Sequence, residues 1–143
     1  MANLEDAILI AVGSHRSQRE KNGMPYVLHP LRLMLNMKTE EEMTVAVLHD
    51  VLEDSDTTAQ DLRARGLSRD VIAAIQCLTR RGNESYGDYV QRIKENPMAV
   101  KVKLADLEDN MNVKRLVEIA PADLERMRRY HGVWRELTGL SEE

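Results

Sequence analysis

Apolar residues recur along this chain at steps of three and four, which is the spacing of one face of an α-helix. Leu4, Ile8 and Ala11 follow this spacing and predict a first helix over residues 3–17. Further helices are expected over 30–37, 40–53, around 61–62, from 68 to about 78, over 86–93, from 97 to about 113, and from 121 onward. No segment alternates apolar and polar residues as a half-buried strand would. The pattern therefore predicts an all-α fold of six to eight helices.

Residues that favour helix ends mark several of these boundaries. Thr39, followed by three glutamates, is a capping-box signal that opens an apolar run. Ser68 is a favoured N-cap residue, and proline suits the first turn of a helix at Pro97 and Pro121. In the last helix we expect one buried face, formed by Leu124, Met127, His131 and Trp134.

The composition agrees with one compact helical bundle, a single domain spanning residues 1–143. The chain contains no Phe and only 3% aromatic residues, so aliphatic side chains must fill the core. A chain of this length buries roughly two-thirds of its unfolded surface, which is enough for a core without disulfides. Its single cysteine, Cys77, is typical of a reducing compartment. No apolar run reaches the ~18 residues of a membrane span and no signal peptide opens the chain, so we expect a cytoplasmic protein without membrane contact.

The charge and the missing motifs limit the function classes. The net charge is −4 at pH 7, and binding to a phosphate backbone needs a net basic surface, so DNA and RNA are not expected partners. The chain has no P-loop, no GxGxxG turn, no GxSxG elbow and no paired CxxC motif. Nucleotide triphosphatases, dinucleotide enzymes, serine hydrolases and zinc fingers therefore lose their main support. The sequence leaves the oligomeric state open, including a homo-oligomer.

Four ionisable residues end the apolar segment that Thr39 opens. His49 and Glu53 are spaced i to i+4, as are Asp50 and Asp54, so a helix would stack them in two neighbouring layers. An imidazole beside a carboxylate can bind one divalent cation, while the second layer handles protons or water. A solvated helix end is the structural alternative, but acidic groups there oppose the helix dipole at about 0.3–1 kcal/mol each. A metal site explains the arrangement better.

Two further positions can complete such a site. Asp106 lies in an apolar segment and needs a partner there, for which a salt bridge to Lys103 or Arg115 is the structural alternative. His29 precedes a proline and is expected at an extended entry to its helix, as a structural histidine or as a ligand. Together these positions form a two-histidine, two-carboxylate set suited to one Mn²⁺, Fe²⁺ or Zn²⁺ ion: His29, His49, Asp50 and Asp106.

Other histidines and cations give weaker signals. We expect His15 to cap the first helix, with a place as a fifth polar group in the site as the alternative, and His131 to pack beside Trp134. The turn at Arg80-Arg81 is either solvated or a phosphate contact.

The order of these residues resembles the HD-domain superfamily of metal-dependent phosphohydrolases. Four segments are similar to the hydrolase domain of the RelA/SpoT proteins and their small stand-alone homologues: residues 23–30, 46–54, 78–79 and 102–106 with Asn110. The resemblance spans roughly residues 8–135. It implies an all-helical HD-domain bundle that removes the 3′-pyrophosphate from ppGpp and pppGpp, usually with Mn²⁺, and a place in the stringent response.

The resemblance also implies a role for each matching residue. It assigns metal binding to His29, His49, Asp50 and Asp106. It assigns activation of the attacking water to Glu53 and Asp54, and substrate contacts to Lys21 and Asn110.

Two departures from the family pattern bear on the substrate. Glu20 stands where the family commonly has an Arg against the guanine base, a contact that contributes about 0.5–2 kcal/mol. A glutamate offers no such contact and would repel a phosphate. Asn110 is followed by Met111-Asn112-Val113, where the family often has Met-Arg-Thr. A nucleoside monophosphate or NADPH is therefore an alternative substrate, and a noncatalytic helical module with a structural metal is a third interpretation.

Overall fold

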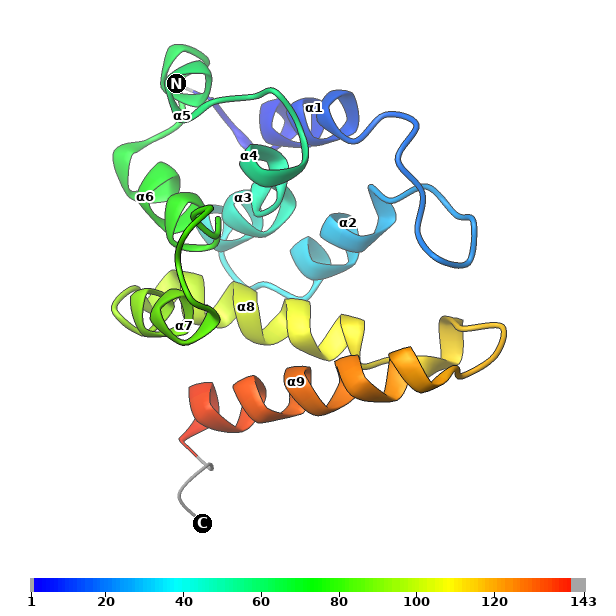
Figure 1. Cartoon of the computed structure of the whole chain (residues 1–143). Helices are drawn as coiled ribbons and strands as arrows, with labels where there is room; N and C mark the ends of the chain where they lie inside the picture. The colour runs from blue at the N-terminus through cyan, green and yellow to red at the C-terminus, as the bar shows by residue number, and fades with distance from the viewer. Residues whose placement is uncertain (1, 140–143) are drawn as a thin grey trace.

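The computed structural model describes residues 2–139, and the regular structure in this range is helical apart from one isolated bridge between Arg19 and Pro25. The helices are α1 (Leu4–Ser14), α2 (Leu28–Leu35), α3 (Glu40–Leu48), α4 (Val51–Asp54), α5 (Ala59–Ala64), α6 (Arg69–Cys77), α7 (Tyr86–Lys94), α8 (Pro97–Asn110) and α9 (Pro121–Thr138), with a 3-10 turn, η1 (Val113–Arg115), before α9. Helix α3 packs against α1, α2, α6 and α8, and α9 lies along α8 (Figure 1). The predicted all-α fold is confirmed.

Helix ends occur close to the residues that predicted them. The side chains of Thr39 and Ser68 accept hydrogen bonds from backbone amides three residues on, at 3.1 and 3.2 Å. Pro97 and Pro121 open α8 and α9, where no intrahelical N–H is needed. Helix α1 ends three residues earlier than expected, and the chain then turns at Ser17, whose φ of 72° is left-handed.

Aliphatic side chains fill the core, as the lack of Phe requires. Fully buried residues from five different helices meet there, among them Leu33, Leu48, Ile75, Ile93 and Val102. Burial of a side chain of this size contributes about 1.5–3 kcal/mol. A smaller cluster forms where α9 packs against α7 and α8. In the part of the chain described, no helix has the length and apolar character that crossing a membrane requires.

The single helix predicted over 40–53 is wrong, because the structure divides it at His49 and Asp50. Helix α3 ends at Leu48 and α4 begins at Val51, with Asp50 at φ −105° and ψ 1°. The imidazole Nδ1 of His49 donates to the carbonyl of Ala46 at 2.8 Å, and a side chain that bonds to the backbone in this way competes with regular helix. Partly because of this division, residues 2–139 form nine α-helices rather than the expected six to eight.

The expected position of His29 and the expected buried face of the last helix also need correction. His29 lies inside the first turn of α2, which tolerates the following Pro30, rather than at an extended entry. In α9, Leu124 is 57% exposed, whereas Val133 is buried. The buried stripe of α9 includes Asp123. Leu124 is the next residue, so it lies about 100° further around the helix and outside the stripe.

Candidate metal centre and adjoining pocket

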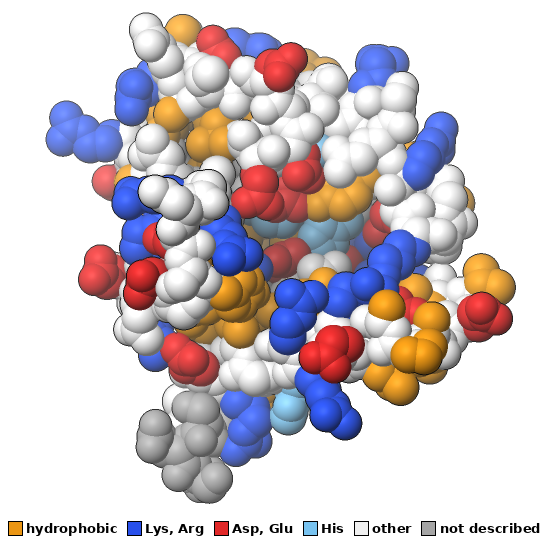
Figure 2. All heavy atoms as spheres, in the orientation of Figure 1, with side chains coloured by type: hydrophobic (Ala, Val, Ile, Leu, Met, Phe, Trp, Pro, Cys, Tyr) orange, Lys and Arg blue, Asp and Glu red, His pale blue; other side chains and the backbone are white. Residues whose placement is uncertain are grey.

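The four residues predicted to bind metal come together, although they belong to three separate segments. His29 lies in α2, His49 and Asp50 lie in the break between α3 and α4, and Asp106 lies in α8. His29 Nε2 is 2.8 Å from Asp106 Oδ1, and His49 Nε2 is 3.1 Å from Asp50 Oδ2. Figure 2 shows histidine and acidic side chains in a hollow, with lysine and arginine side chains to its left and lower right.

The hydrogen bonds of His49 leave one ring nitrogen available to a metal. Because Nδ1 donates to the carbonyl of Ala46, Nε2 faces the carboxylates. Nε2 is buried and has no hydrogen-bond partner in the described chain, although oxygens of Asp50 and Asp106 lie 3.1 and 3.6 Å away. Buried polar atoms are normally paired, and a cation between this nitrogen and the carboxylates would satisfy it. Ligand atoms of His29, His49 and Asp50 lie within 4.8 Å of one another, so the residues fit a histidine–carboxylate metal centre.

Opposite charges keep the carboxylates of the centre ionised. Burial alone would raise the pKa of Asp106, but Lys103 and the two histidines hold this pKa well below its usual value. Lys103 Nζ lies 3.1 Å from Asp106 Oδ2. Burial alone would lower the pKa of Lys103, but the negative charge of Asp106 raises this pKa above its usual value. The salt bridge considered as an alternative for Asp106 therefore exists alongside the histidine contacts. Ionised carboxylates are the form that binds a cation.

The two carboxylates expected to activate water lie in different surroundings. Glu53 lines the same cavity as the histidines and accepts a hydrogen bond from the backbone N–H of Arg80 at 3.1 Å. Asp54 accepts from Gln18 Nε2 at 3.3 Å and lines a separate hollow beside α1. Partial burial raises the pKa of both carboxyl groups above the usual range. Of the two, Glu53 faces the histidine cluster.

Tyr26 belongs to the centre but was not among the predicted residues. Its hydroxyl donates to Asp50 Oδ2, and its ring packs between the rings of His15 and His29, with centroids 5.0 and 5.6 Å away. Burial raises the pKa of Tyr26, so the hydroxyl remains a hydrogen-bond donor. His15 is the C-cap residue of α1, as expected. The position of Tyr26, three residues before His29, is the signal that could have identified it.

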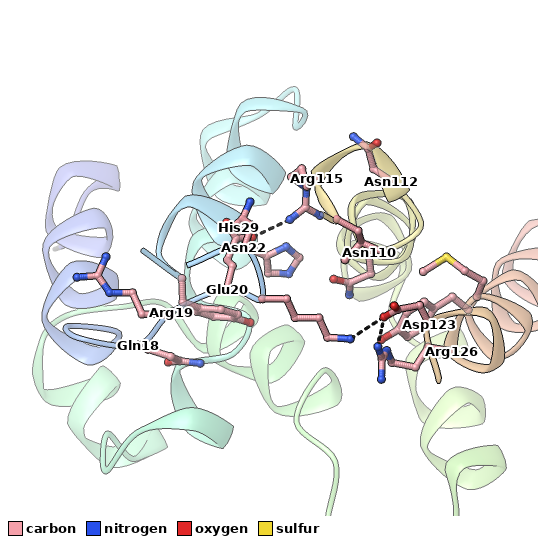
Figure 3. A pocket seen from close by; sticks show the side chains of 15 residues that line it. Gln18, Arg19, Glu20, Asn22, His29, Asn110, Asn112, Arg115, Asp123 and Arg126 are labelled. Carbon is pink, nitrogen blue, oxygen red and sulfur yellow. Dashed lines mark hydrogen bonds and ion pairs between the residues drawn. The ribbon is translucent and has the colours of Figure 1, made fainter. Parts of the chain in front are cut away.

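A second cavity, of about 270 Å³, adjoins the one that contains the histidines (Figure 3). Both predicted substrate contacts line it: Lys21, whose Nζ lies 3.1 Å from Asp123 Oδ1, and Asn110, which donates to Asp106 Oδ1 at 3.2 Å. Arg126 also pairs with Asp123. The side chain of Asn110 thus connects the outer cavity to the metal-ligand cluster.

Glu20 lines this outer cavity but is not an unpaired acid. Its Oε1 lies 2.5 Å from Arg32 Nη2 and 2.8 Å from Arg115 Nη1, and its side chain is only 8% exposed. The two guanidinium groups neutralise the carboxylate, so the expectation that Glu20 would repel a phosphate is not supported by its surroundings. Arg32 was missed as part of the site, and Arg115, considered only as a partner of Asp106, binds Glu20 and Asp109 instead.

Comparisons with known proteins found similar sequences and a similar solved structure. A guanosine-3′,5′-bis(diphosphate) 3′-pyrophosphohydrolase of Aquifex aeolicus is 31% identical over 120 residues, which is 76% of this chain and 17% of that protein. The zebrafish (Danio rerio) enzyme of the same name, MESH1, is 37% identical over 71 residues, 44% of this chain and 39% of that protein. No protein-family model matches. The chain spans about a sixth of the length of the bacterial relative.

A solved structure has the same fold. It is described as a metazoan ortholog of SpoT that hydrolyses ppGpp, and it aligns with a TM-score of 0.77 over 96% of this chain and 85% of the other, at 20% identity. This likeness shows the fold, on which the chain holds a cluster of two histidines and an aspartate. The curated relatives confirm the resemblance to the hydrolase domain of the RelA/SpoT proteins.

Proposed function

We propose that this protein is a metal-dependent phosphohydrolase that removes the 3′-pyrophosphate from ppGpp and pppGpp in the cytoplasm, as a component of the stringent response. The observation that carries the proposal is the buried nitrogen of His49, which faces two carboxylates without a hydrogen-bond partner in the described chain and lies beside a cavity whose lining includes Lys21, Arg115 and Arg126. The relatives named as ppGpp 3′-pyrophosphohydrolases support the substrate.

The proposed metal ligands are His29, His49, Asp50 and Asp106. We assign Mn²⁺ to the site, and its imidazole and carboxylate donors also suit Fe²⁺ and Zn²⁺. When bound, such an ion polarises a phosphoryl oxygen and lowers the pKa of water.

We assign roles to the remaining residues of the site, and their positions support these assignments. Glu53 takes a proton from the attacking water, because its carboxylate lines the cavity and partial burial raises its pKa toward neutral pH. Asp54, the next residue in the chain, lines the separate hollow beside α1 and is the second candidate base. We assign the nucleotide contacts to Lys21 and Asn110, which line the outer cavity, and electrostatic stabilisation of the phosphate under attack to Lys103 on the wall of the inner cavity.

A nucleotide panel tests this function. The metal-free protein is supplied with Mn²⁺ and offered ppGpp, pppGpp, nucleoside monophosphates and NADPH, and the released products are identified. We expect pyrophosphate release from ppGpp to exceed every other reaction, and we expect Asp106→Asn to abolish it. Glu108→Gln, which removes a charge from the exposed side of the same helix, is the matched control. Faster hydrolysis of NADPH or a monophosphate would mean that the protein acts on that substrate instead. Absence of hydrolysis with every nucleotide would refute the proposal.

A further inference from the structure

A carboxylate outside the predicted metal ligands contacts one of them. Asp109 precedes Asn110 on α8, and its side chain is only 12% exposed. Its Oδ2 lies 2.6 Å from His29 Nδ1, the ring nitrogen on the side opposite the one that approaches Asp106. The two nitrogens of His29 therefore have different partners.

We infer that Asp109 is a positioning residue that orients His29 toward the metal. A histidine that binds a metal through one nitrogen generally donates its other N–H to a carboxylate or carbonyl, which fixes the ring and increases the basicity of the ligating nitrogen. Asp109 is the carboxylate at Nδ1, so Nε2 points into the cluster. This inference rests on the metal site proposed above.

Two guanidinium groups hold Asp109 in this place. Arg32 donates from Nε to Asp109 Oδ1 at 2.8 Å and from Nη2 to Oδ2 at 3.0 Å. Arg115 donates to the carbonyl oxygen of Asp109 at 2.6 Å and approaches its carboxylate at 3.2 Å. The fork of an arginine fixes the orientation of a carboxylate as well as its charge. The position of Asp109 is thus defined on both sides by groups other than His29.

Glu20 also belongs to this network, and its two ion pairs account for its position in the pocket. Both arginines that bind Asp109 also bind Glu20, so two carboxylates and two guanidinium groups alternate around a partly buried ring of charges. An arginine at position 20 would remove the second carboxylate that Arg32 and Arg115 share and place a third positive charge beside them. Glu20 therefore supports the metal ligand through Arg32 and Arg115, while lining the nucleotide cavity itself.

The affinity of the metal-free protein for Mn²⁺, followed by the electron paramagnetic resonance signal of free Mn²⁺, tests this role. We expect Asp109→Asn to weaken binding by about 10–100-fold, the usual effect of removing such a partner. Glu108→Gln, which removes the same charge from the neighbouring exposed position, should bind as the wild type does. Saturating Mn²⁺ should return the kcat of Asp109→Asn toward the wild-type value, which would not follow from a purely structural defect.

Unchanged Mn²⁺ affinity in folded Asp109→Asn would overturn the inference and leave the metal site intact. Failure of the wild type to bind Mn²⁺ would instead overturn the proposed function. If Asp109→Asn does not fold, Arg32→Gln tests the same network, because it removes two hydrogen bonds from Asp109 and leaves the carboxylate in place. Weaker Mn²⁺ binding by Arg32→Gln supports the inference, and wild-type binding contradicts it.

Discussion

Replacement of Lys103 by Met removes the only charge of this side chain and keeps its aliphatic length. The ammonium group lies 3.1 Å from Asp106 Oδ2 and 5.4 Å from the centre of the Tyr89 ring, and the side chain is 12% exposed. Loss of one partner of a buried ion pair costs about 3–5 kcal/mol. Because Asp106 keeps its contacts with His29 and His49, we expect the lower end, about 3 kcal/mol. For a chain of 143 residues this corresponds to a fall in Tm of roughly 10 °C.

The same substitution should strengthen metal binding. A cation at the centre would take over the neutralisation of Asp106, and the competing ammonium group would be gone. The rise in Tm on adding Mn²⁺, which reports the affinity by mass action, should therefore be larger in Lys103→Met than in the wild type.

Differential scanning calorimetry with and without Mn²⁺ measures both effects. Lys101→Met is the matched control. Lys101 is on the same helix and pairs with Glu42, but its side chain is 61% exposed. An exposed pair contributes about 0–1 kcal/mol. A Tm for Lys103→Met equal to that of Lys101→Met would refute the buried ion pair, and a smaller Mn²⁺-induced rise than in the wild type would refute the competition with the metal.

Three further predictions address the base, the acid stability and the core. Glu53→Gln should lower kcat by about 10²–10⁴-fold and leave Mn²⁺ affinity unchanged, as measured by steady-state kinetics and metal titration; wild-type turnover would exclude Glu53 as the base. Hydrogen bonds from Arg92 lower the pKa of Glu84 from 4.5 to about 2, so Glu84→Gln should reduce stability at neutral pH. The difference from the wild type in urea denaturation should shrink as the pH falls from about 4.5 toward 2, and a difference independent of pH would contradict this linkage. Ile75→Ala, at a fully buried position, should cost about 2–5 kcal/mol in the same assay, and a cost below about 1 kcal/mol would mean that the core is not packed as described.

The helices were predictable wherever a local signal defined them. Capping residues such as Thr39 and Ser68 and the prolines of α8 and α9 act within a few positions of where they stand. The division at His49 and Asp50 was not predictable in this way. Apolar periodicity continues through both residues, whereas the break involves a hydrogen bond from an imidazole to the backbone, which depends on the rotamer of one side chain.

The candidate site shows the same difference between local and distant information. The residues that carry the family resemblance do converge, although they are up to 77 positions apart, as for His29 and Asp106. The ring formed by Glu20, Arg32, Asp109 and Arg115 was missed, since each of these residues taken alone resembles an ordinary surface charge. Glu20 was expected to repel a phosphate, because the sequence does not show that Arg32 and Arg115, 12 and 95 positions away, neutralise it.

The most direct test of the proposed metal-dependent hydrolysis titrates the metal-free protein with Mn²⁺ while bound Mn²⁺ and pyrophosphate release from ppGpp are measured in parallel. We predict that both signals saturate at one ion per chain with the same midpoint, and that a chelator removes both. Hydrolysis that persists in the chelator, or Mn²⁺ binding at the histidine cluster without release of pyrophosphate, would contradict the account.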